Sequence, residues 1–371
     1  MRFSTCFLSL LLVVPSLALP SPRAFKTIVV NSTTNVELSY IDSGAPAGAA
    51  TYPTIFAIHG IIFSNLVFQK LMDSASSLGV RVVGINRRPF PGSTPFTDAE
   101  LNVIYTGGSG TAERQAELDA RGHELGTFIA NFITQFNLPR LSADGKTGGA
   151  VLLGWSLGAP FALAAVSAAG SLPPATLETL SANLRSIIVY EPAPLAIGLP
   201  TPSQNWNPLV DSTIPADLQL EAFGQWVTAY FDNNIANRNL DDLAWVVTSP
   251  SHTPTLYTIA AAGKLDAMQE LGADAQTDLP FIFNFASELL GSYRNALFDA
   301  NTAATFPKLK RSVLCGTKTA AFGVNGFWAI QDDQAANAPQ ASIAYKMMDG
   351  TNHLAIWDNP TTIINTVKSL V

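Results

Sequence analysis

Short runs of apolar and β-branched residues alternate along most of the chain with stretches in which apolar residues recur every three or four positions. The runs predict buried strands, and the second pattern predicts helices. The expected strands are 25–30, 36–44, 54–60, 80–86, 149–156, 184–192, 310–316 and 341–350. The expected helices among them are 65–79, 110–136, 157–169 and 360–370.

Continuous apolar strands separated by helices imply an α/β fold, with a mainly parallel central sheet covered by helices on both faces. The first two strands, joined by the polar turn 31–35, predict a hairpin that forms an antiparallel edge. Right-handed crossovers place the carboxyl ends of parallel strands along one edge of the sheet, so we expect the ligand at that edge.

From residue 195 to residue 309 the alternation stops, and Pro-rich loops separate three helical stretches, 218–231, 255–271 and 279–298. This change predicts a helical cap inserted into the sheet domain. The chain then divides into a first core part, 25–194, the cap, 195–309, and a last core part, 310–371.

The chain begins with a basic residue, an apolar run and then small residues, which predicts a secretory signal peptide spanning residues 1–18. The run contains Pro15 and is shorter than the roughly 20 residues that span a bilayer, which disfavours a membrane anchor. Asn31 opens an Asn-Ser-Thr sequon, in keeping with a secreted glycoprotein. Loss of the signal would remove Cys6 and leave Cys315 without a disulfide partner.

Composition and charge narrow the range of partners. Of the 371 residues, 47% are hydrophobic and only 13% are charged, which is ample apolar material for a large core. The formal net charge is -7 and no Lys/Arg-rich block occurs, so nucleic acid and anionic lipid are not expected partners. Beyond the signal no segment is long and apolar enough for stable insertion into a membrane.

One motif carries chemistry: Gly154-Trp155-Ser156-Leu157-Gly158, at the junction of an expected strand and an expected helix. A nucleophile elbow requires that context. The turn is so sharp that a Cβ on either flanking glycine would collide with nearby backbone. The helix that follows directs free N–H groups and its positive dipole end toward an anion formed beside the serine.

A serine hydroxyl needs a base to remove its proton, and the chain offers four histidines. His59 directly follows a strand and precedes a glycine, and His123 lies on the long helix 110–136. His252 lies in a loop, and His353 lies just beyond the last strand. All four histidines stay candidates for the base at this point, although His123 is expected to be a solvated helix residue.

The order of these features resembles the α/β-hydrolase superfamily. The features are a strand followed by His59-Gly60, the Gly-Trp-Ser-Leu-Gly elbow, an inserted helical cap and a late histidine. The resemblance covers nearly the whole chain from Phe25 to Val371. It implies a serine hydrolase that uses no metal ion and no organic cofactor.

The resemblance also implies roles for individual residues. Ser156 corresponds to the nucleophile and His353 to the general base. The backbone N–H groups of Leu157 and Ile61 correspond to the oxyanion hole, which stabilises the tetrahedral intermediate. His59 then shapes the loop that carries Ile61 and is not the base.

The acid that orients the base is less clear from the sequence, because Thr317 and Thr319 stand where the superfamily often has an aspartate. Asp332 and Asp333 remain candidates, but they fall in an expected helix with polar surroundings, so a solvated face explains them better. Glu191 ends a core strand on the edge where Ser156 emerges. Its carboxylate could accept the second N–H of the histidine, although it could also simply cap a turn.

Two further features have structural interpretations. Arg87 and Arg88 follow a strand in a Pro/Gly-rich loop and are expected to pair with carboxylates and brace that loop. Cys315 ends an apolar strand, which predicts a buried, inert thiol.

The sequence therefore predicts a secreted serine hydrolase that cleaves an ester, thioester or lactone through an acyl-enzyme. Many aromatic residues lie in 195–309, and we expect most of them to pack the cap and some to line a pocket for a hydrophobic small molecule. Two alternatives stay open: an acyltransferase with the same acyl-enzyme, and a binding protein of this fold that has lost catalysis.

Overall fold

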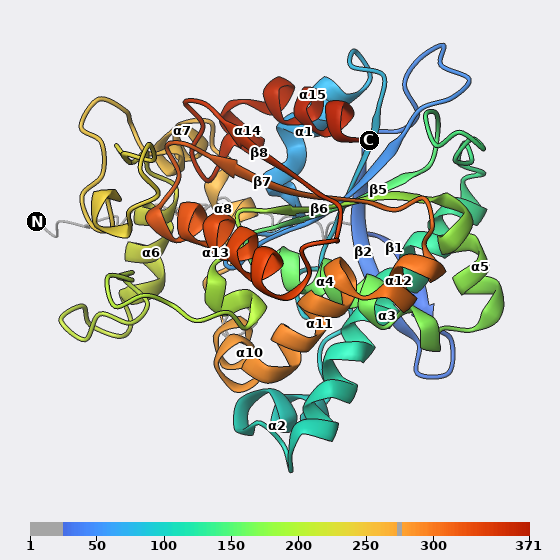
Figure 1. Ribbon diagram of the computed structural model, residues 1–371, viewed down its shortest axis with the longest axis horizontal. Coiled ribbons are helices and arrows are strands. Elements are labelled where there is room, and N and C mark those ends of the chain that lie inside the picture. The colour runs from blue at the N-terminus through green and yellow to red at the C-terminus, as the bar shows by residue number, and fades with distance from the viewer. Residues whose placement is uncertain (1–24, 273–276) are drawn as a thin grey trace, which may run out of the picture.

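The computed structural model describes residues 25–272 and 277–371, so the predicted signal peptide lies outside the described residues (Figure 1). An eight-stranded sheet with the order β1-β2-β4-β3-β5-β6-β7-β8 forms its centre. The strands are β1 (Lys26–Asn31), β2 (Val36–Asp42), β3 (Thr54–Ile58), β4 (Arg81–Ile85), β5 (Ala150–Trp155), β6 (Leu184–Tyr190), β7 (Lys310–Gly316) and β8 (Ile343–Met348). Every strand predicted from the sequence is present.

Neighbouring strands from β4 to β8 pair in parallel, whereas β2 pairs antiparallel with both β1 and β4. The mainly parallel sheet with a hairpin at one edge is thus confirmed. Every residue of β3, β4, β5 and β6 is buried, because helices cover both faces of these central strands. The edge strand β1 alternates between exposed and buried residues.

Helices cover both faces of the sheet (Figure 1). On one face α1 (Gln69–Ala75), α14 (Ala355–Asp358) and α15 (Pro360–Leu370) pack together. On the other face α3 (Thr111–Gln135) and α11 (Ala286–Phe298) pack against α4 (Gly158–Ser167). Nearly all of α4 is buried, as its uniformly apolar sequence requires. The remaining core helices are α2 (Asp98–Thr106), α5 (Pro174–Asn183) and α13 (Ala321–Asn337), with 3-10 turns at Asn65–Phe68 (η1) and Ala169–Ser171 (η2).

The described residues between β6 and β7 form short helices joined by loops. They are η3 (Pro194–Ile197), α6 (Gln219–Val227), η4 (Leu240–Asp242), α7 (Thr255–Ala261), α8 (Leu265–Met268), α10 (Asp278–Asn284), α11 and α12 (Ala300–Thr305). The expected helices 255–271 and 279–298 are each interrupted. Gly263, with a φ of 63°, separates α7 from α8, and Phe285 lies between α10 and α11.

The parallel register aligns the carboxyl ends of the central strands. Ile58 pairs with Gly154, Trp155 pairs with Tyr190, and Tyr190 pairs with Leu314. The residues that follow β3, β5, β6 and β7 therefore emerge side by side at one edge of the sheet. Within the described ranges, no helix has the length and apolarity that crossing a membrane requires.

Candidate active site

Ser156 lies on a strained turn between β5 and α4. Its φ is 53°, a left-handed value that a residue with a side chain seldom adopts. The turn is held by a 2.8 Å hydrogen bond from the Ser156 N–H to the Tyr190 carbonyl. A Cβ on Gly154 would lie 2.6 Å from the Ala159 Cα, and one on Gly158 would collide with the Ile58 carbonyl, so both positions require glycine.

The loop after β3 passes directly over this turn. A Cβ on Gly60 would lie 2.9 Å from the Ser156 Cβ, so only glycine permits the approach. Ile61 and Leu157 line the same cavity as Ser156. Within the described part of the chain, the N–H groups of Ile61 and Leu157 donate to no other protein group. Two free donors thus flank the serine, as an oxyanion hole requires.

The side chains of His353 and Glu191 form a buried pair. His353 Nδ1 lies 2.6 Å from Glu191 Oε2, and both side chains are almost completely buried. The indole N–H of Trp155 donates to the His353 carbonyl at 3.0 Å, which ties the histidine loop to the strand that precedes Ser156. The Trp155 ring also lies against the His353 ring, with centroids 5.1 Å apart.

Glu191 directly follows β6 and has a φ of 50°, so it is a second strained residue beside Ser156. Its Oε1 accepts a hydrogen bond from the Gly316 N–H at 2.6 Å. Its Oε2 accepts one from the Thr319 hydroxyl at 2.9 Å, in addition to the contact with His353. Three groups therefore hold the carboxylate. Thr319, one of the two threonines after β7 where an aspartate was sought in the sequence, instead donates a hydrogen bond to Glu191.

The structure therefore brings His353 and Glu191 into direct contact and places them beside the turn that carries Ser156. Among the described residues, the Ser156 hydroxyl donates no hydrogen bond, and it opens into the cavity. Serine–histidine hydrogen bonds are often long in unliganded enzymes and shorten when substrate binds.

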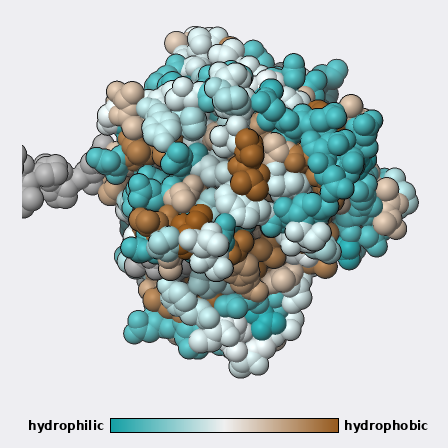
Figure 2. Space-filling view, turned by 90° about the vertical axis from the view of Figure 1, so that its left-hand side faces the viewer, coloured by the Kyte–Doolittle hydropathy of each residue, from teal (hydrophilic) through white to brown (hydrophobic). Residues whose placement is uncertain are grey.

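The cavity at Ser156 has a volume of about 260 Å³ and a mostly apolar wall. The wall combines residues of the core with residues of the segment between β6 and β7: Ile61, Leu157, Leu195, Leu209, Val210, Phe223, Leu279, Ile282, Phe283 and Phe322. Val210 and Phe283 are half-exposed and mark the mouth of the cavity. Figure 2 shows the face formed by the left-hand side of Figure 1, where apolar side chains gather among polar ones.

The other three histidines, His59, His123 and His252, contact groups that lie outside the Glu191–His353 pair. The Nε2 of His59 accepts a hydrogen bond from the Arg87 backbone N–H at 3.1 Å, and the Nδ1 of His59 lies 2.9 Å from the Gly60 carbonyl oxygen. Complete burial, and then the nearby Arg87 charge, hold the pKa of His59 well below its usual value. His59 therefore stays neutral and shapes its loop. His123 contacts the Ser171 hydroxyl and is only half-buried, and His252 stacks on Tyr230.

The two alternative acids lie on α13 and pair with arginines. Asp332 is exposed and pairs with Arg238 at 2.7 Å, as a solvated helix face predicts. The prediction was wrong for Asp333, which is buried beneath Arg294 and bonded to it and to Asn337. The Arg294 side chain reaches Asp333 from α11. Both aspartates already have partners other than His353.

The structural interpretations of the arginines and the cysteine are confirmed. Arg87 forms a buried ion pair with Asp278 at 2.9 Å. The buried Arg88 forms ion pairs with Glu124 and with the half-buried Glu100. Cys315 is completely buried, and burial raises the pKa of its thiol well above the usual value.

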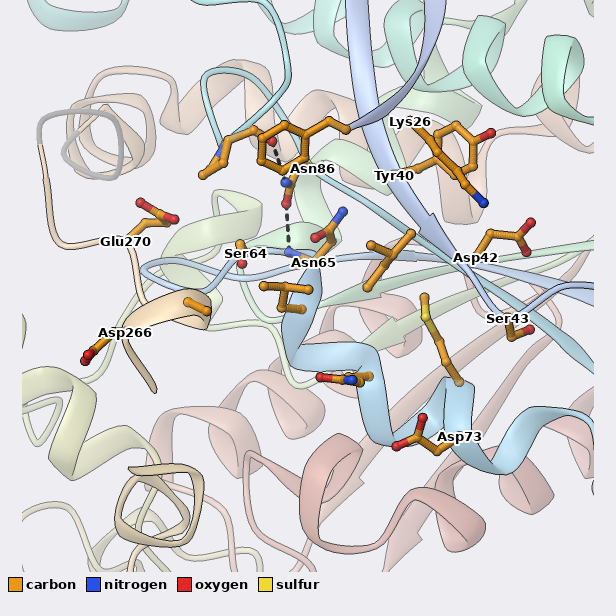
Figure 3. A pocket seen from close by; sticks show the side chains of 17 residues that line it. Lys26, Tyr40, Asp42, Ser43, Ser64, Asn65, Asp73, Asn86, Asp266 and Glu270 are labelled. Carbon is orange, nitrogen blue, oxygen red and sulfur yellow. Dashed lines mark hydrogen bonds between the residues drawn. The ribbon is translucent and has the colours of Figure 1, made fainter. Parts of the chain in front are cut away.

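A larger cavity of about 770 Å³ lies beside β2, η1 and α1 (Figure 3). Two of its polar side chains have partners within the protein. Asn86 Oδ1 accepts from the Asn65 N–H at 2.7 Å, the contact drawn in Figure 3, and Asp42 pairs with Arg81. Among the described residues, histidines, cysteines and acidic side chains do not gather in a group that could hold a metal ion.

The strand order, the helices on both faces and the elbow at the end of β5 together decide the architecture. The chain has the α/β-hydrolase fold.

No protein-family model matches the sequence, and no curated protein matches it. Solved structures of the α/β-hydrolase fold are similar to the chain. A bromoperoxidase from Bacillus anthracis is 13% identical, with a TM-score of 0.49 over 94% of this chain and 99% of that one. An esterase from Exiguobacterium antarcticum is 14% identical, with a TM-score of 0.47 over 93% and 98%. An N-acyl homoserine lactonase is 12% identical, with a TM-score of 0.49 over 93% and 95%.

Proposed function

We propose that this chain is a secreted serine hydrolase that cleaves an ester, thioester or lactone through an acyl-enzyme. One observation carries the proposal: a serine on a strained elbow opens into an apolar cavity beside a buried histidine–carboxylate pair. That combination supplies a nucleophile, a base and a group that orients the base.

In the proposed reaction the Ser156 oxygen attacks the substrate carbonyl carbon while His353 takes the hydroxyl proton. The carbonyl oxygen becomes an oxyanion, and the N–H groups of Ile61 and Leu157 stabilise it. The tetrahedral intermediate then collapses, the carbonyl C–O or C–S bond breaks, and His353 donates its proton to the departing oxygen or sulfur, which becomes an alcohol or thiol. Water attacks the acyl-enzyme by the same route, releases the acid and restores Ser156.

Glu191 orients the base in this scheme. A carboxylate at Nδ1 fixes the tautomer that leaves Nε2 free to accept a proton, and it stabilises the imidazolium that forms. The hydrogen bonds from Gly316 and Thr319 hold the carboxylate in place. In the scheme no step is assigned to Asp332 or Asp333.

A hydrophobic small molecule suits the cavity best, because its wall is mostly apolar. We further propose that residues 195–309 act as a lid, since Phe223, Leu279 and Ile282 from this segment form part of the wall. Secretion rests on the signal-like start of the sequence and on the Asn31 sequon, which begins at the exposed last residue of β1 and continues into the turn that follows. Nucleic acid and membrane-inserted forms are not part of the proposal.

A fluorophosphonate probe tests the activated serine. We expect labelling of the wild type and none of Ser156→Ala, with both proteins folded by circular dichroism. A folded wild type that resists the probe would support the binding protein instead. Turnover of ester and lactone panels with and without added alcohol separates hydrolysis from acyl transfer, because a transferase forms the new ester in preference to the acid.

A further inference from the structure

The carbonyl of Gly60 accepts two hydrogen bonds, and the peptide to which it belongs also contains the Ile61 N–H. The Nδ1 of His59 lies 2.9 Å from the Gly60 oxygen, and the Arg87 Nη2 lies 3.1 Å from it. The Nε2 of His59 accepts a hydrogen bond from the Arg87 backbone N–H, so the ring proton resides on Nδ1, which donates a hydrogen bond to the Gly60 carbonyl. Both lone pairs of this carbonyl are therefore occupied.

A trans peptide is planar, with its C=O and N–H pointing in opposite directions. Fixing the Gly60 oxygen therefore also fixes the direction of the Ile61 N–H. The following residue, Ile62, has a φ of 59°, which a β-branched side chain strongly disfavours. The loop thus has a disfavoured backbone conformation. The contacts to Gly60 and the hydrogen bond from the Glu270 N–H to the Ile62 carbonyl both stabilise it.

The Arg87 guanidinium is itself fixed from several sides. Its Nε donates to the His59 carbonyl at 3.2 Å, and two nitrogens bind the Asp278 carboxylate at 2.9 Å. The guanidinium carbon of Arg87 lies over the Phe161 ring, 4.4 Å from the centre of that ring. Asp278 begins α10, whose residues Leu279 and Ile282 line the Ser156 cavity.

We propose that Arg87 is a positioning residue for the oxyanion hole. Its hydrogen bond to the Gly60 carbonyl sets the direction of the Ile61 N–H. Its ion pair with Asp278 connects Arg87 to α10, the helix that lines the cavity. The inference rests on the proposed function. It adds that the helix lining the cavity and the donor that stabilises the oxyanion are linked through a single buried side chain.

Arg88 provides a matched control. It is as buried as Arg87 and pairs with two carboxylates where Arg87 pairs with one, and its side-chain hydrogen bonds go to groups outside the Gly60 loop. Arg87→Met and Arg88→Met both remove a buried guanidinium, so both should lower the unfolding midpoint. Arg87→Lys keeps the charge opposite Asp278 but lacks the planar fork that reaches three acceptors, and it serves if Arg87→Met fails to fold.

The measurements are kcat and KM for an activated ester and the affinities for two inhibitors. The rates are expressed per mole of folded enzyme. A trifluoromethyl ketone forms an oxyanion on Ser156, whereas the corresponding methyl ketone binds mainly as a neutral molecule. For both Arg87 variants we expect kcat and trifluoromethyl ketone affinity to fall together by about 10- to 100-fold, below the loss of a whole donor. KM and methyl ketone affinity should stay unchanged, and Arg88→Met should change neither inhibitor constant.

Equal losses in the Arg87 and Arg88 variants, or parallel losses of both inhibitors, would overturn the positioning role while leaving the serine hydrolase intact. A wild type that neither reacts with the fluorophosphonate nor binds the trifluoromethyl ketone more tightly than the methyl ketone overturns both proposals.

Discussion

Glu191 gives the sharpest prediction at the scale of single residues. Glu191→Gln keeps the shape of the side chain but removes the charge that orients His353, so we expect kcat to fall by about 10³- to 10⁴-fold. Asp332→Asn should leave kcat unchanged, because that side chain is exposed and paired with Arg238. Steady-state kinetics on the two purified variants decide the matter, and equal rates would return Glu191 to the role of a turn residue.

Asp333 is unsuitable as a second control, although its sequence context suggested a solvated face. Its burial and its pairing with Arg294 mean that Asp333→Asn would also destabilise the fold. A fall in activity could then reflect unfolding. Asp332 alone offers a change of charge without that complication.

Thr319 yields a second prediction for a single side chain. Thr319→Val retains the shape but removes the hydroxyl that donates to the buried Glu191 carboxylate. Loss of a hydrogen bond to a charged group should lower the free energy of unfolding by about 1.5–3 kcal/mol, and kcat should fall as the carboxylate loosens. Thr317→Val is the matched control, since the Thr317 hydroxyl bonds to Asp349 at the surface. Urea titration and kinetics of both variants would reveal a difference, and its absence would contradict the role of Thr319.

The sequence could identify residues whose chemistry coincides with a strand end. Ser156, Glu191 and His353 each follow a strand, so the parallel sheet predicts that they gather at one edge. Thr319 and Arg87 could not be assigned in that way. Their roles depend on which atom of a distant segment they reach, and spacing along the chain does not encode that distance.

At the scale of elements, strands were predicted more fully than helices. Central strands are continuous apolar runs because both faces are buried, and that pattern is unambiguous. The short helices α2 and α5 were not expected, because each presents only a few apolar residues to the core. The signals that do mark them are local: Thr97 and Glu100 form a capping box at α2, and Pro174 opens α5.

The junction between β5 and α4 gives a prediction at this scale. Gly158→Ala places a methyl group against the Ile58 carbonyl, so α4 must move away from β3. Such overpacking should cost about 1–3 kcal/mol of unfolding free energy and reduce probe labelling of Ser156. Gly170→Ala is the control, because a Cβ there meets nothing within 4 Å and should change stability by less than about 1 kcal/mol. Equal stabilities of the two variants would argue against a tight elbow.

At the scale of the whole molecule, the segment between β6 and β7 does two different things. Its helix α11 packs against α3 and α4 and so belongs to the layer that covers the sheet. Residues nearer its start and on α10 instead close the cavity at Ser156. Composition alone distinguishes this segment from the core, but it cannot show that one part of it covers the sheet.

The cavity at Ser156 is formed by the core together with the segment between β6 and β7, and its volume limits the length of the acyl chain that can bind. At roughly 30 Å³ per small group, about nine non-hydrogen groups fit into the cavity. For a series of straight-chain acyl esters, kcat/KM should rise by about 0.8 kcal/mol of transition-state stabilisation per buried methylene, up to about eight carbons, and then fall. Ile282→Trp should move the optimum to shorter chains. An optimum that stays at acetyl esters in both proteins would contradict an apolar acyl site.

The buried His59 makes the stability of the whole fold depend on pH. Its pKa in the folded protein lies well below the usual value of about 6.5, so the unfolded chain binds this proton more readily. The contribution of His59 to stability is therefore complete above pH 6.5 and is lost as the pH falls below it. We expect a loss of up to about 1.4 kcal/mol per pH unit from this one group.

His59→Gln cannot titrate, so it should remove that slope even if it lowers stability at every pH. Urea unfolding of the wild type and of this variant between pH 5 and pH 8 gives the difference directly, because all other groups contribute equally to both curves. Parallel curves for the wild type and His59→Gln would mean that the pKa of His59 is the same in the folded and the unfolded protein. That result would contradict burial as the force that keeps the ring neutral, with Nε2 accepting a hydrogen bond from the Arg87 N–H.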